Sequence, residues 1–482
     1  MTAPTTARRK FPTGFLFGAA TAAYQIEGAA SEDGRTDSIW DAFSRIPGAV
    51  VNADNGDVAC DHYHRHTADV GLMKELGLGT YRFSTSWSRV RPDGGPVNPT
   101  GLDFYSRLVD ELLGAGIKPW LTLYHWDLPQ ALEEKGGWVN RDTAELFRDY
   151  ALSVHDALGD RVGVWTTLNE PWCSAFIGYT AGVHAPGRQS KTDGLAAGHH
   201  LLLGHGLAVE ALRTRDPGLE LGITLNLTVA KPVDPTRPGD VDAARRIDGQ
   251  MNRFFLDPIF RGSYPADVLD DVAHLGLAPF VRDGDLAQIH QPLDSLGVNY
   301  YNGSMVSDRP TEFPQVSHDP TGRVTGSPFP AADGVFNHSQ GLPVTAMDWE
   351  VQPDGLRELL VRIQAEYTGP AWTDLYVTEN GAAYDDVVAT DGAVHDADRT
   401  RFLELHLGAV LDAIDEGVDV KGYFYWSLLD NYEWAWGYQK RFGIVRVDYD
   451  TQVRTVKDSG HAYAAIIASR SLPAAVDAAF SK

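Results

Sequence analysis

Short apolar runs alternate with amphipathic stretches from one end of the chain to the other. Several of these runs are continuously apolar, which is typical of strands buried on both faces of a parallel sheet. They predict eight strands, at residues 15–21, 79–86, 118–125, 162–169, 219–226, 295–301, 374–381 and 421–428.

Between these runs, apolar residues recur at the helical period. In residues 66–76, Val70, Met73 and Leu76 lie on one face, and Gly77 follows as a residue that can end the helix. The same pattern predicts helices at residues 102–113, 143–158 and 400–414. Eight strands that alternate with helices predict an α/β fold, a single (β/α)₈ or TIM barrel.

The chain has 482 residues, whereas a minimal barrel needs only about 250. The surplus predicts long loops at the face that carries the active site. The clearest is residues 307–343, which contain six prolines and precede further strand-like sequence, so we expect a loop over one barrel face. We expect the barrel domain at 11–470, between a disordered N-terminal tail at 1–10 and a C-terminal tail at 471–482.

Charge and composition exclude several classes of partner. Acidic residues outnumber basic ones 65 to 41, which gives a net charge of −24. So acidic a surface repels phosphate, which argues against nucleic acid and anionic membranes as partners. The sequence contains no apolar run of membrane-spanning length and no secretory signal, and its two cysteines cannot form a disulfide framework. We therefore expect a cytoplasmic protein.

Polar and aromatic residues gather at the predicted strand ends, where barrels of this kind place their active sites. These are Arg82, His125, Trp126, Asn169, Glu170, Asn299, Tyr301, Glu379, Asn380 and Trp426. Glu170 closes the fourth strand and Glu379 the seventh. Two facing carboxylates are what hydrolysis of a glycosidic bond requires, and aromatic rings with amides suit the apolar faces and hydroxyl edges of a sugar.

Longer motifs carry a resemblance to a known family. They are FPTGFLFGAATAAYQIEG (11–28), CDHYHRH (60–66), YRFSTSWSRV (81–90), YHWDLPQ (124–130), TLNEPW (167–172), GVNYY (297–301), YVTENG (376–381) and WSLLDNYEWAWGY (426–438). In this order and over nearly its whole length, the chain resembles the family 1 glycoside hydrolases, the β-glucosidase family.

The resemblance implies a retaining β-glucosidase without cofactor or metal. Such an enzyme removes terminal, non-reducing β-D-glucosyl residues from small glucosides or oligosaccharides by double displacement. Glu379 matches the family's nucleophile and Glu170 its acid/base residue. Their carboxyl groups are then expected roughly 5–5.5 Å apart, whereas a separation near 9 Å would indicate an inverting enzyme.

The resemblance also implies the substrate-binding residues. Those that hold the hydroxyls of the glycone, the sugar that is released, match Gln25, His125, Trp126, Asn169, Glu433 and Trp434. Trp426 matches the stacking floor, Arg82 and Tyr301 match residues beside the nucleophile, and Asn299 lines the same region. Trp172 and Trp349 match positions on the leaving-group side, where the family commonly has glycine in place of Asp348. An anionic Glu433 would repel a 6-phosphate, which favours unphosphorylated sugars.

Other interpretations remain open at this stage. The same residues often accept galactose or fucose, and a transglycosylase would differ only in whether sugar or water intercepts the glycosyl-enzyme. A sugar-binding protein without chemistry is the alternative from another class, but both carboxylates are present. The oligomeric state is open.

Two further motifs have competing interpretations. His62, His64 and His66 could bind a metal if they lay on a strand, but we expect structural histidines in the first turn of the following helix, where their spacing does not converge. Cys173 lacks a partner base other than Glu170, so we expect a buried apolar filler rather than a nucleophile.

Overall fold

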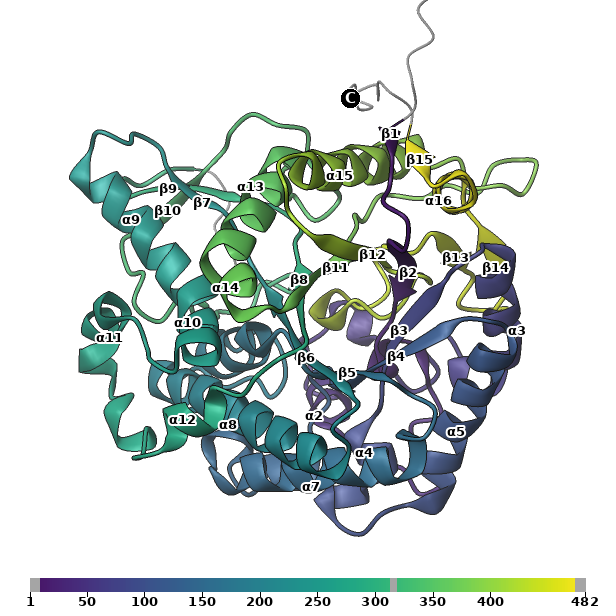
Figure 1. Cartoon of the computed structure of the whole chain (residues 1–482), viewed down its shortest axis with the longest axis horizontal. Helices are drawn as coiled ribbons and strands as arrows, with labels where there is room; N and C mark the ends of the chain where they lie inside the picture. The colour runs from purple at the N-terminus through teal and green to yellow at the C-terminus, as the bar shows by residue number, and fades with distance from the viewer. Residues whose placement is uncertain (1–8, 313–318, 473–482) are drawn as a thin grey trace, which may run out of the picture.

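Eight parallel strands close into a barrel at the centre of the computed structural model (Figure 1). In order around the barrel they are β2 (Leu16–Ala20), β3 (Thr80–Ser84), β4 (Lys118–Tyr124), β5 (Val164–Asn169), β6 (Glu220–Asn226), β8 (Ser295–Asn299), β11 (Asp374–Asn380) and β12 (Val420–Trp426). The structure describes residues 9–312 and 319–472. All eight predicted strands are confirmed, with ends within two residues of those expected.

The interior of the barrel is filled by large side chains from opposite strands. The Trp120 ring on β4 packs edge-on against Tyr376 of β11 and Phe424 of β12, at centroid distances of 4.8 and 5.0 Å. Because β4 lies across the barrel from the neighbouring strands β11 and β12, the three rings must meet inside it. The interior is therefore a packed core rather than a pore.

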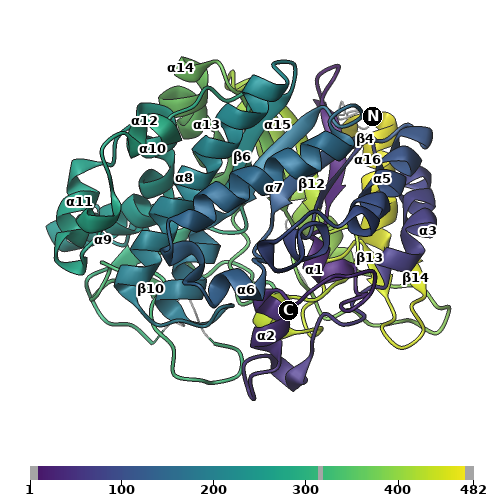
Figure 2. The ribbon, with the colours of Figure 1, turned by 90° about the horizontal axis from the view of Figure 1, so that it is seen from below.

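Helices surround the strands (Figure 1). From below, α7 and α8 run across the front of the molecule (Figure 2). The four predicted helices are confirmed as α3 (His62–Glu75), α5 (Pro99–Gly114), α7 (Asp142–Leu158) and α15 (Ala397–Asp415). Gly77 follows α3 with φ 75°, the left-handed conformation expected of a residue that ends a helix. The outer layer also contains α8 (Lys191–Arg215), α13 (Pro353–Ile363) and α16 (Asp458–Ser469), which the pattern of apolar positions did not predict.

Shorter elements connect the main ones. The helices are α1 (Ala23–Ile26), α2 (Ile39–Ser44), α4 (Trp87–Val90), α6 (Gln130–Glu133), α9 (Pro238–Asp248), α10 (Phe254–Arg261), α11 (Ala266–Val272), α12 (Asp285–Ile289) and α14 (Gly369–Ala371). The short strands β13 (Val445–Val447) and β14 (Arg454–Val456) pair with each other. A further helical segment, η4 (Cys173–Ala181), follows β5.

The long loop predicted at 307–343 contains a strand. β10 (Phe336–His338) pairs with β9 (Ser304–Ser307), and β9 pairs with β7 (Ala230–Pro232), so that a small sheet anchors both ends of the loop. Between them, the Phe329 ring packs against Trp172 with centroids 5.3 Å apart. Because Trp172 lies just after β5, the loop covers the carboxyl end of the barrel, as expected.

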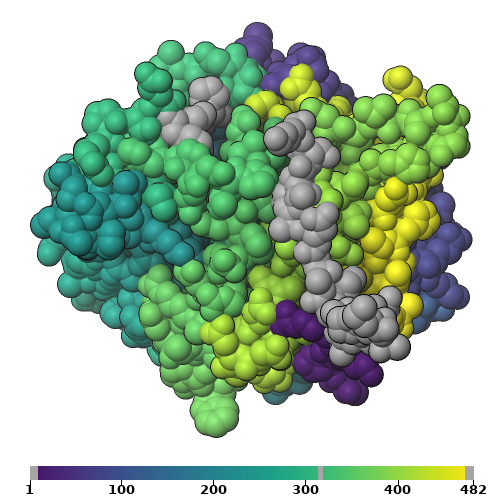
Figure 3. Space-filling model, turned by 90° about the horizontal axis from the view of Figure 1, so that it is seen from above, coloured from purple at the N-terminus to yellow at the C-terminus, as the bar shows by residue number. Residues whose placement is uncertain are grey.

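The ordered domain extends beyond both predicted boundaries. β1 (Arg9–Lys10) pairs antiparallel with β15 (Ser471–Leu472), so two residues assigned to each tail belong to the fold. The remaining tail residues, 1–8 and 473–482, lie outside the described residues. Figure 3 shows this molecule from above, with green residues from the second half of the chain across the centre of the face. None of the described helices is long and apolar enough to cross a membrane.

Candidate active site

Two buried glutamates lie at the carboxyl ends of barrel strands. Glu170 directly follows β5, and Glu379 is the last residue but one of β11. Their exposed fractions are 5% and 2%. Glu379 is in register with Asn299, the last residue of β8, so β8 supplies a polar side chain at the same level of the barrel.

Glu379 is held from two sides. The Arg82 guanidinium on β3 donates through Nη1 to Glu379 Oε1 over 2.6 Å, and Tyr301 donates its hydroxyl to Oε2 over 2.7 Å. Arg82 also donates through Nη2 to Asn169 Oδ1, again over 2.6 Å. The arginine therefore links the end of β11 to the end of β5.

Glu170 is held by different donors. Asn299 Nδ2 lies 2.7 Å from Glu170 Oε1 and 3.1 Å from Asn169 Oδ1, while the Thr378 hydroxyl donates to Asn299 Oδ1 over 2.8 Å. The Cys173 thiol donates to Glu170 Oε2 over 3.2 Å. A continuous chain of hydrogen bonds thus connects the two carboxyl groups, through Asn299, Asn169 and Arg82.

The surroundings of the two carboxyls differ in charge. Burial and the neighbouring Glu379 carboxylate raise the pKa of Glu170 to about 8. Burial also raises the pKa of Glu379, but there the Arg82 cation and the Tyr301 hydroxyl act in the opposite direction. Since a cation contacts only Glu379, the first proton shared by the pair resides on Glu170. This arrangement suits one carboxyl for giving a proton and the other for acting as an ionised oxygen nucleophile.

Aromatic rings gather beside the carboxyls. Trp126 and Trp434 pack with ring centroids 4.5 Å apart, and His125 stacks against Trp426 at 5.6 Å. The Trp126 indole donates to the Asn169 carbonyl over 2.9 Å. These rings come from the ends of β4 and β12 and from the segment after β12, as the strand-end motifs predicted.

His125 is neutral and has a defined tautomer. Asn169 Oδ1 accepts hydrogen bonds from Arg82 and Asn299. The other side-chain atom of this amide, Asn169 Nδ2, therefore donates to His125 Nε2 over 3.1 Å. Burial, with a contribution from the Arg82 cation, lowers the pKa of His125 well below its usual value. Nδ1 then carries the proton and is a hydrogen-bond donor.

Three of the side chains predicted to bind the glycone have a buried polar atom without a partner among the described residues. The atoms are Gln25 Oε1, His125 Nδ1 and Glu433 Oε2. Buried polar atoms are nearly always hydrogen-bonded in folded proteins. Gln25 Oε1 is an acceptor, His125 Nδ1 is a donor, and Glu433 Oε2 is either, according to its protonation. Such groups match what sugar hydroxyls offer.

The two tryptophans predicted on the leaving-group side lie in different clusters. Trp349 is partly exposed and packs against Tyr301 at 5.4 Å and Phe442 at 6.1 Å. Trp172 is buried against Phe176 and Phe329. Of these ring contacts, only that between Trp349 and Tyr301 involves a residue that donates to a carboxyl group.

Asp348 occupies a position with a special backbone conformation. Its φ is 58°, in the left-handed region that glycine adopts most easily and aspartate tolerates. A glycine, which the resemblance leads one to expect at this position, would adopt this conformation with less strain.

The histidine motif lies at the start of α3, and both cysteines are buried. His62 begins α3 and bonds Asp69 over 2.8 Å, so the predicted helical first turn is confirmed. Across residues 9–312 and 319–472, the structure has no group of three or more His, Cys, Asp or Glu side chains that could hold a metal ion. Cys60 and Cys173 are both free and buried. The prediction of Cys173 as an apolar filler was incomplete, because its thiol also bonds Glu170.

The structure adds two residues that the motifs did not single out. Asn431 accepts a hydrogen bond from Gln25 Nε2 over 3.0 Å and so orients that amide. The His184 ring lies 5.6 Å from Trp126 and 6.3 Å from Trp434. Asn431 lies in a quoted motif and could have been found there, whereas His184 stands in a segment with no strand-end signal.

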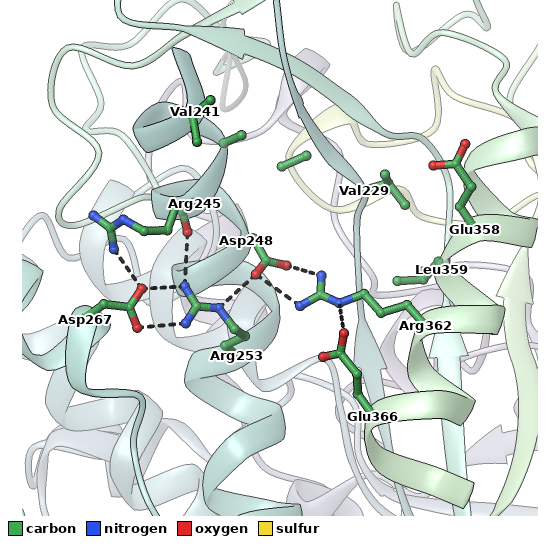
Figure 4. A pocket seen from close by; sticks show the side chains of 12 residues that line it. Val229, Val241, Arg245, Asp248, Arg253, Asp267, Glu358, Leu359, Arg362 and Glu366 are labelled. Carbon is green, nitrogen blue, oxygen red and sulfur yellow. Dashed lines mark hydrogen bonds and ion pairs between the residues drawn. The ribbon is translucent and has the colours of Figure 1, made fainter. Parts of the chain in front are cut away.

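A separate surface hollow of about 590 Å³ lies between α9 and α13 (Figure 4). Its arginines face carboxylates. Arg253 contacts Asp248 and Asp267 over 2.8 and 2.7 Å, and Arg362 pairs with Asp248 and Glu366. Because its arginines are paired with carboxylates and neither Glu170 nor Glu379 lines the hollow, we assign it no function.

Comparisons with known proteins agree with this geometry. The family model described as glycosyl hydrolase family 1 matches residues 7–472. A crystal structure of a psychrophilic beta-glucosidase from Micrococcus antarcticus matches with a TM-score of 0.94 and 57% identity, over 96% of this chain and 98% of that one. The thermostable beta-glucosidase B of Thermobispora bispora is 52% identical over 95% of this chain and 90% of its own length. A bifunctional beta-D-glucosidase/beta-D-fucosidase of Bifidobacterium breve is 50% identical over 96% of this chain and 99% of its own length. The chain belongs to glycosyl hydrolase family 1.

Proposed function

We propose that this protein is a retaining β-glucosidase that removes terminal, non-reducing β-D-glucosyl residues from small glucosides or oligosaccharides. Glu379 is the nucleophile and Glu170 the acid/base residue. The observation that carries the proposal is the unequal environment of the two buried carboxyls. Glu379 contacts the Arg82 cation, and Glu170 has a pKa raised to about 8.

In the first step, a carboxylate oxygen of Glu379 attacks the anomeric carbon while Glu170 gives its proton to the departing glycosidic oxygen. The C–O bond to the leaving group breaks and an ester bond to Glu379 forms. Esterification removes the negative charge of Glu379, so the electrostatic reason for the high pKa of Glu170 weakens and Glu170 remains as a carboxylate.

In the second step, Glu170 takes a proton from water, and the water oxygen attacks the anomeric carbon. The ester to Glu379 breaks and the sugar leaves with its original configuration. The expected carboxyl separation of roughly 5–5.5 Å remains a prediction of this mechanism.

The glycone is held by Gln25, His125, Trp126, Asn169, Glu433 and Trp434, with Trp426 as a stacking surface. The three unpartnered polar atoms described above support this assignment, because sugar hydroxyls would complete their hydrogen bonds. Arg82, Tyr301 and Asn299 orient the two carboxyls. Trp349 supports the leaving-group side through its contact with Tyr301. Trp172, which follows β5 and packs against Phe329 of the covering loop, lines the same side.

The sugar preference is proposed as glucose, with fucose as the second choice. One close relative is named for both β-D-glucosidase and β-D-fucosidase activity. An epimeric or missing hydroxyl changes one or two hydrogen bonds in such a site. The cytoplasmic location expected from the sequence remains a prediction.

The decisive test is hydrolysis of an aryl β-D-glucoside by the wild type and by Glu379→Ala, with and without azide. We expect turnover by the wild type, loss of activity in the variant, and azide-dependent formation of α-glucosyl azide by the variant. Glu416→Ala is the matched control, because Glu416 is a partly exposed glutamate paired with Arg357 on the protein surface. Full activity of Glu379→Ala would refute the site. A wild type inactive on glucosides, galactosides and fucosides would favour the sugar-binding alternative.

A further inference from the structure

The Cys173 side chain contacts the carboxyl group that we assign as acid/base. Its thiol donates to Glu170 Oε2 over 3.2 Å, and its backbone amide donates to the Glu170 carbonyl over 3.0 Å. Both residues are buried. Cys173 begins the helical segment η4, so three residues of separation bring its side chain back onto Glu170.

The thiol completes the set of donors around Glu170. Asn299 Nδ2 occupies Oε1, and the thiol occupies Oε2. With a donor at each oxygen, rotation of the carboxyl group would break a hydrogen bond. The carboxyl plane is therefore fixed from two opposite sides, by residues of β8 and η4.

We propose that Cys173 is a positioning residue for the acid/base Glu170, and that its thiol holds the carboxyl in the orientation that both steps of the reaction use. This inference rests on the proposed function. A positioning role differs from a space-filling role because it requires the S–H donor of Cys173 and not only the volume of its side chain.

The chemistry of the thiol suits this role. Burial and the Glu170 charge raise the pKa of Cys173 well above its usual value, so the thiol keeps its proton and remains a donor. A donor binds a carboxylate more strongly than a carboxylic acid. The thiol therefore favours the ionised form of Glu170, which is the form required when water attacks the glycosyl-enzyme.

Removal of the donor has two expected consequences. In Cys173→Ala, the basic limb of the pH profile of kcat/KM moves upward by roughly half a pH unit, because one hydrogen bond to the carboxylate is lost. The value of kcat/KM at the pH optimum falls about threefold to tenfold on phenyl β-D-glucoside. It falls less on 2,4-dinitrophenyl β-D-glucoside, whose leaving group needs little help from an acid.

The experiment compares Cys173→Ala, Cys173→Ser and the matched control Cys60→Ala across the pH profile on both substrates. Cys173→Ser keeps a donor and is expected to keep the basic limb near that of the wild type. Cys60 is also buried, but its thiol donates to the Asp430 carbonyl over 3.0 Å and contacts neither glutamate. Thermal melting of each variant separates loss of folding from loss of positioning.

The outcomes distinguish this inference from the proposed function. If Cys173→Ala melts earlier but keeps the limb and the ratio between the two substrates, Cys173 is only a filler and the inference is wrong. If alanine and serine shift the limb equally, the donor is irrelevant, which also contradicts it. Glu170→Gln is measured in parallel: if that variant retains the wild-type basic limb, the assignment of Glu170 itself fails.

Discussion

Arg82 Nη1 lies 2.6 Å from Glu379 Oε1, and both side chains are buried. The contact pairs a fixed cation with the proposed nucleophile in a region where water cannot screen either charge. The same guanidinium reaches Asn169, so a single residue sets both the charge of one carboxyl and the geometry next to the other.

Substitution of Arg82 is therefore expected to affect both activity and stability. Arg82→Met leaves Glu379 buried without its cation, which destabilises the fold by about 3–5 kcal/mol. The acidic limb of the kcat/KM profile moves to higher pH, because Glu379 ionises less readily without Arg82. Arg82→Lys keeps the charge but not the second contact, so it should shift the limb less. Denaturant unfolding and pH profiles of the three proteins measure both effects. An acidic limb that stays at the same pH in Arg82→Met would contradict the pairing.

Glu170→Ala is expected to show a dependence on the leaving group. Removal of the acid lowers kcat/KM roughly 10²–10⁴-fold on phenyl β-D-glucoside, with a much smaller loss on 2,4-dinitrophenyl β-D-glucoside. Azide should restore turnover and give β-glucosyl azide, since the glycosyl-enzyme still forms on Glu379. The product of the Glu379→Ala reaction has the opposite configuration. Recovery of the same anomer from both variants would contradict the two roles.

Glu433 is expected to make stability depend on pH. Burial, with the charges of Glu379 and Glu170, raises its pKa from 4.5 to about 8. Below pH 4.5 the carboxyl is protonated whether the chain is folded or not. Between these values only the unfolded chain releases the proton, so a rise in pH favours unfolding.

Glu433→Gln should remove this contribution. The melting temperature of the wild type is expected to fall more than that of the variant between pH 5 and pH 9, and the variant should lose activity because a glycone contact changes. Glu416→Gln is the control, since Glu416 is partly exposed. Parallel pH curves for the wild type and Glu433→Gln would show that Glu433 ionises normally.

The barrel could be predicted because its strands are buried on both faces and read as continuous apolar runs. The helix α8 could not. This helix packs between η4 and α7 and is buried on most of its circumference. Its own apolar residues therefore occur on most sides, and no single apolar stripe appears in the sequence. Its length and type became apparent only from its neighbours in the fold.

The candidate site could be predicted residue by residue from the motifs, but its backbone could not. Trp126, Glu170 and Trp434 all have positive φ, at 76°, 47° and 48°. Left-handed conformations are unfavourable for such residues and collect at functional sites, where surrounding contacts impose them. The local sequence preferences of these residues do not predict a positive φ. The thiol contact of Cys173 was missed for a related reason, since its direction depends on the turn that begins at Glu170.

A buried ion cluster behind the site gives the last prediction. Lys457 Nζ lies 2.7 Å from Asp430 Oδ1 and also pairs with Asp386. All three side chains are at most 1% exposed. Lys457→Met leaves two carboxylates with less compensation in the core, so the free energy of unfolding should fall by about 3–5 kcal/mol.

The matched control is Lys421→Met. Lys421 is 36% exposed and pairs with the exposed Asp419, so its loss should cost no more than about 1 kcal/mol. Since Lys457 contacts neither glutamate, kcat per folded molecule should stay near the wild-type value in both variants. Equal destabilisation by the two substitutions would mean that the cluster contributes no more than a surface pair.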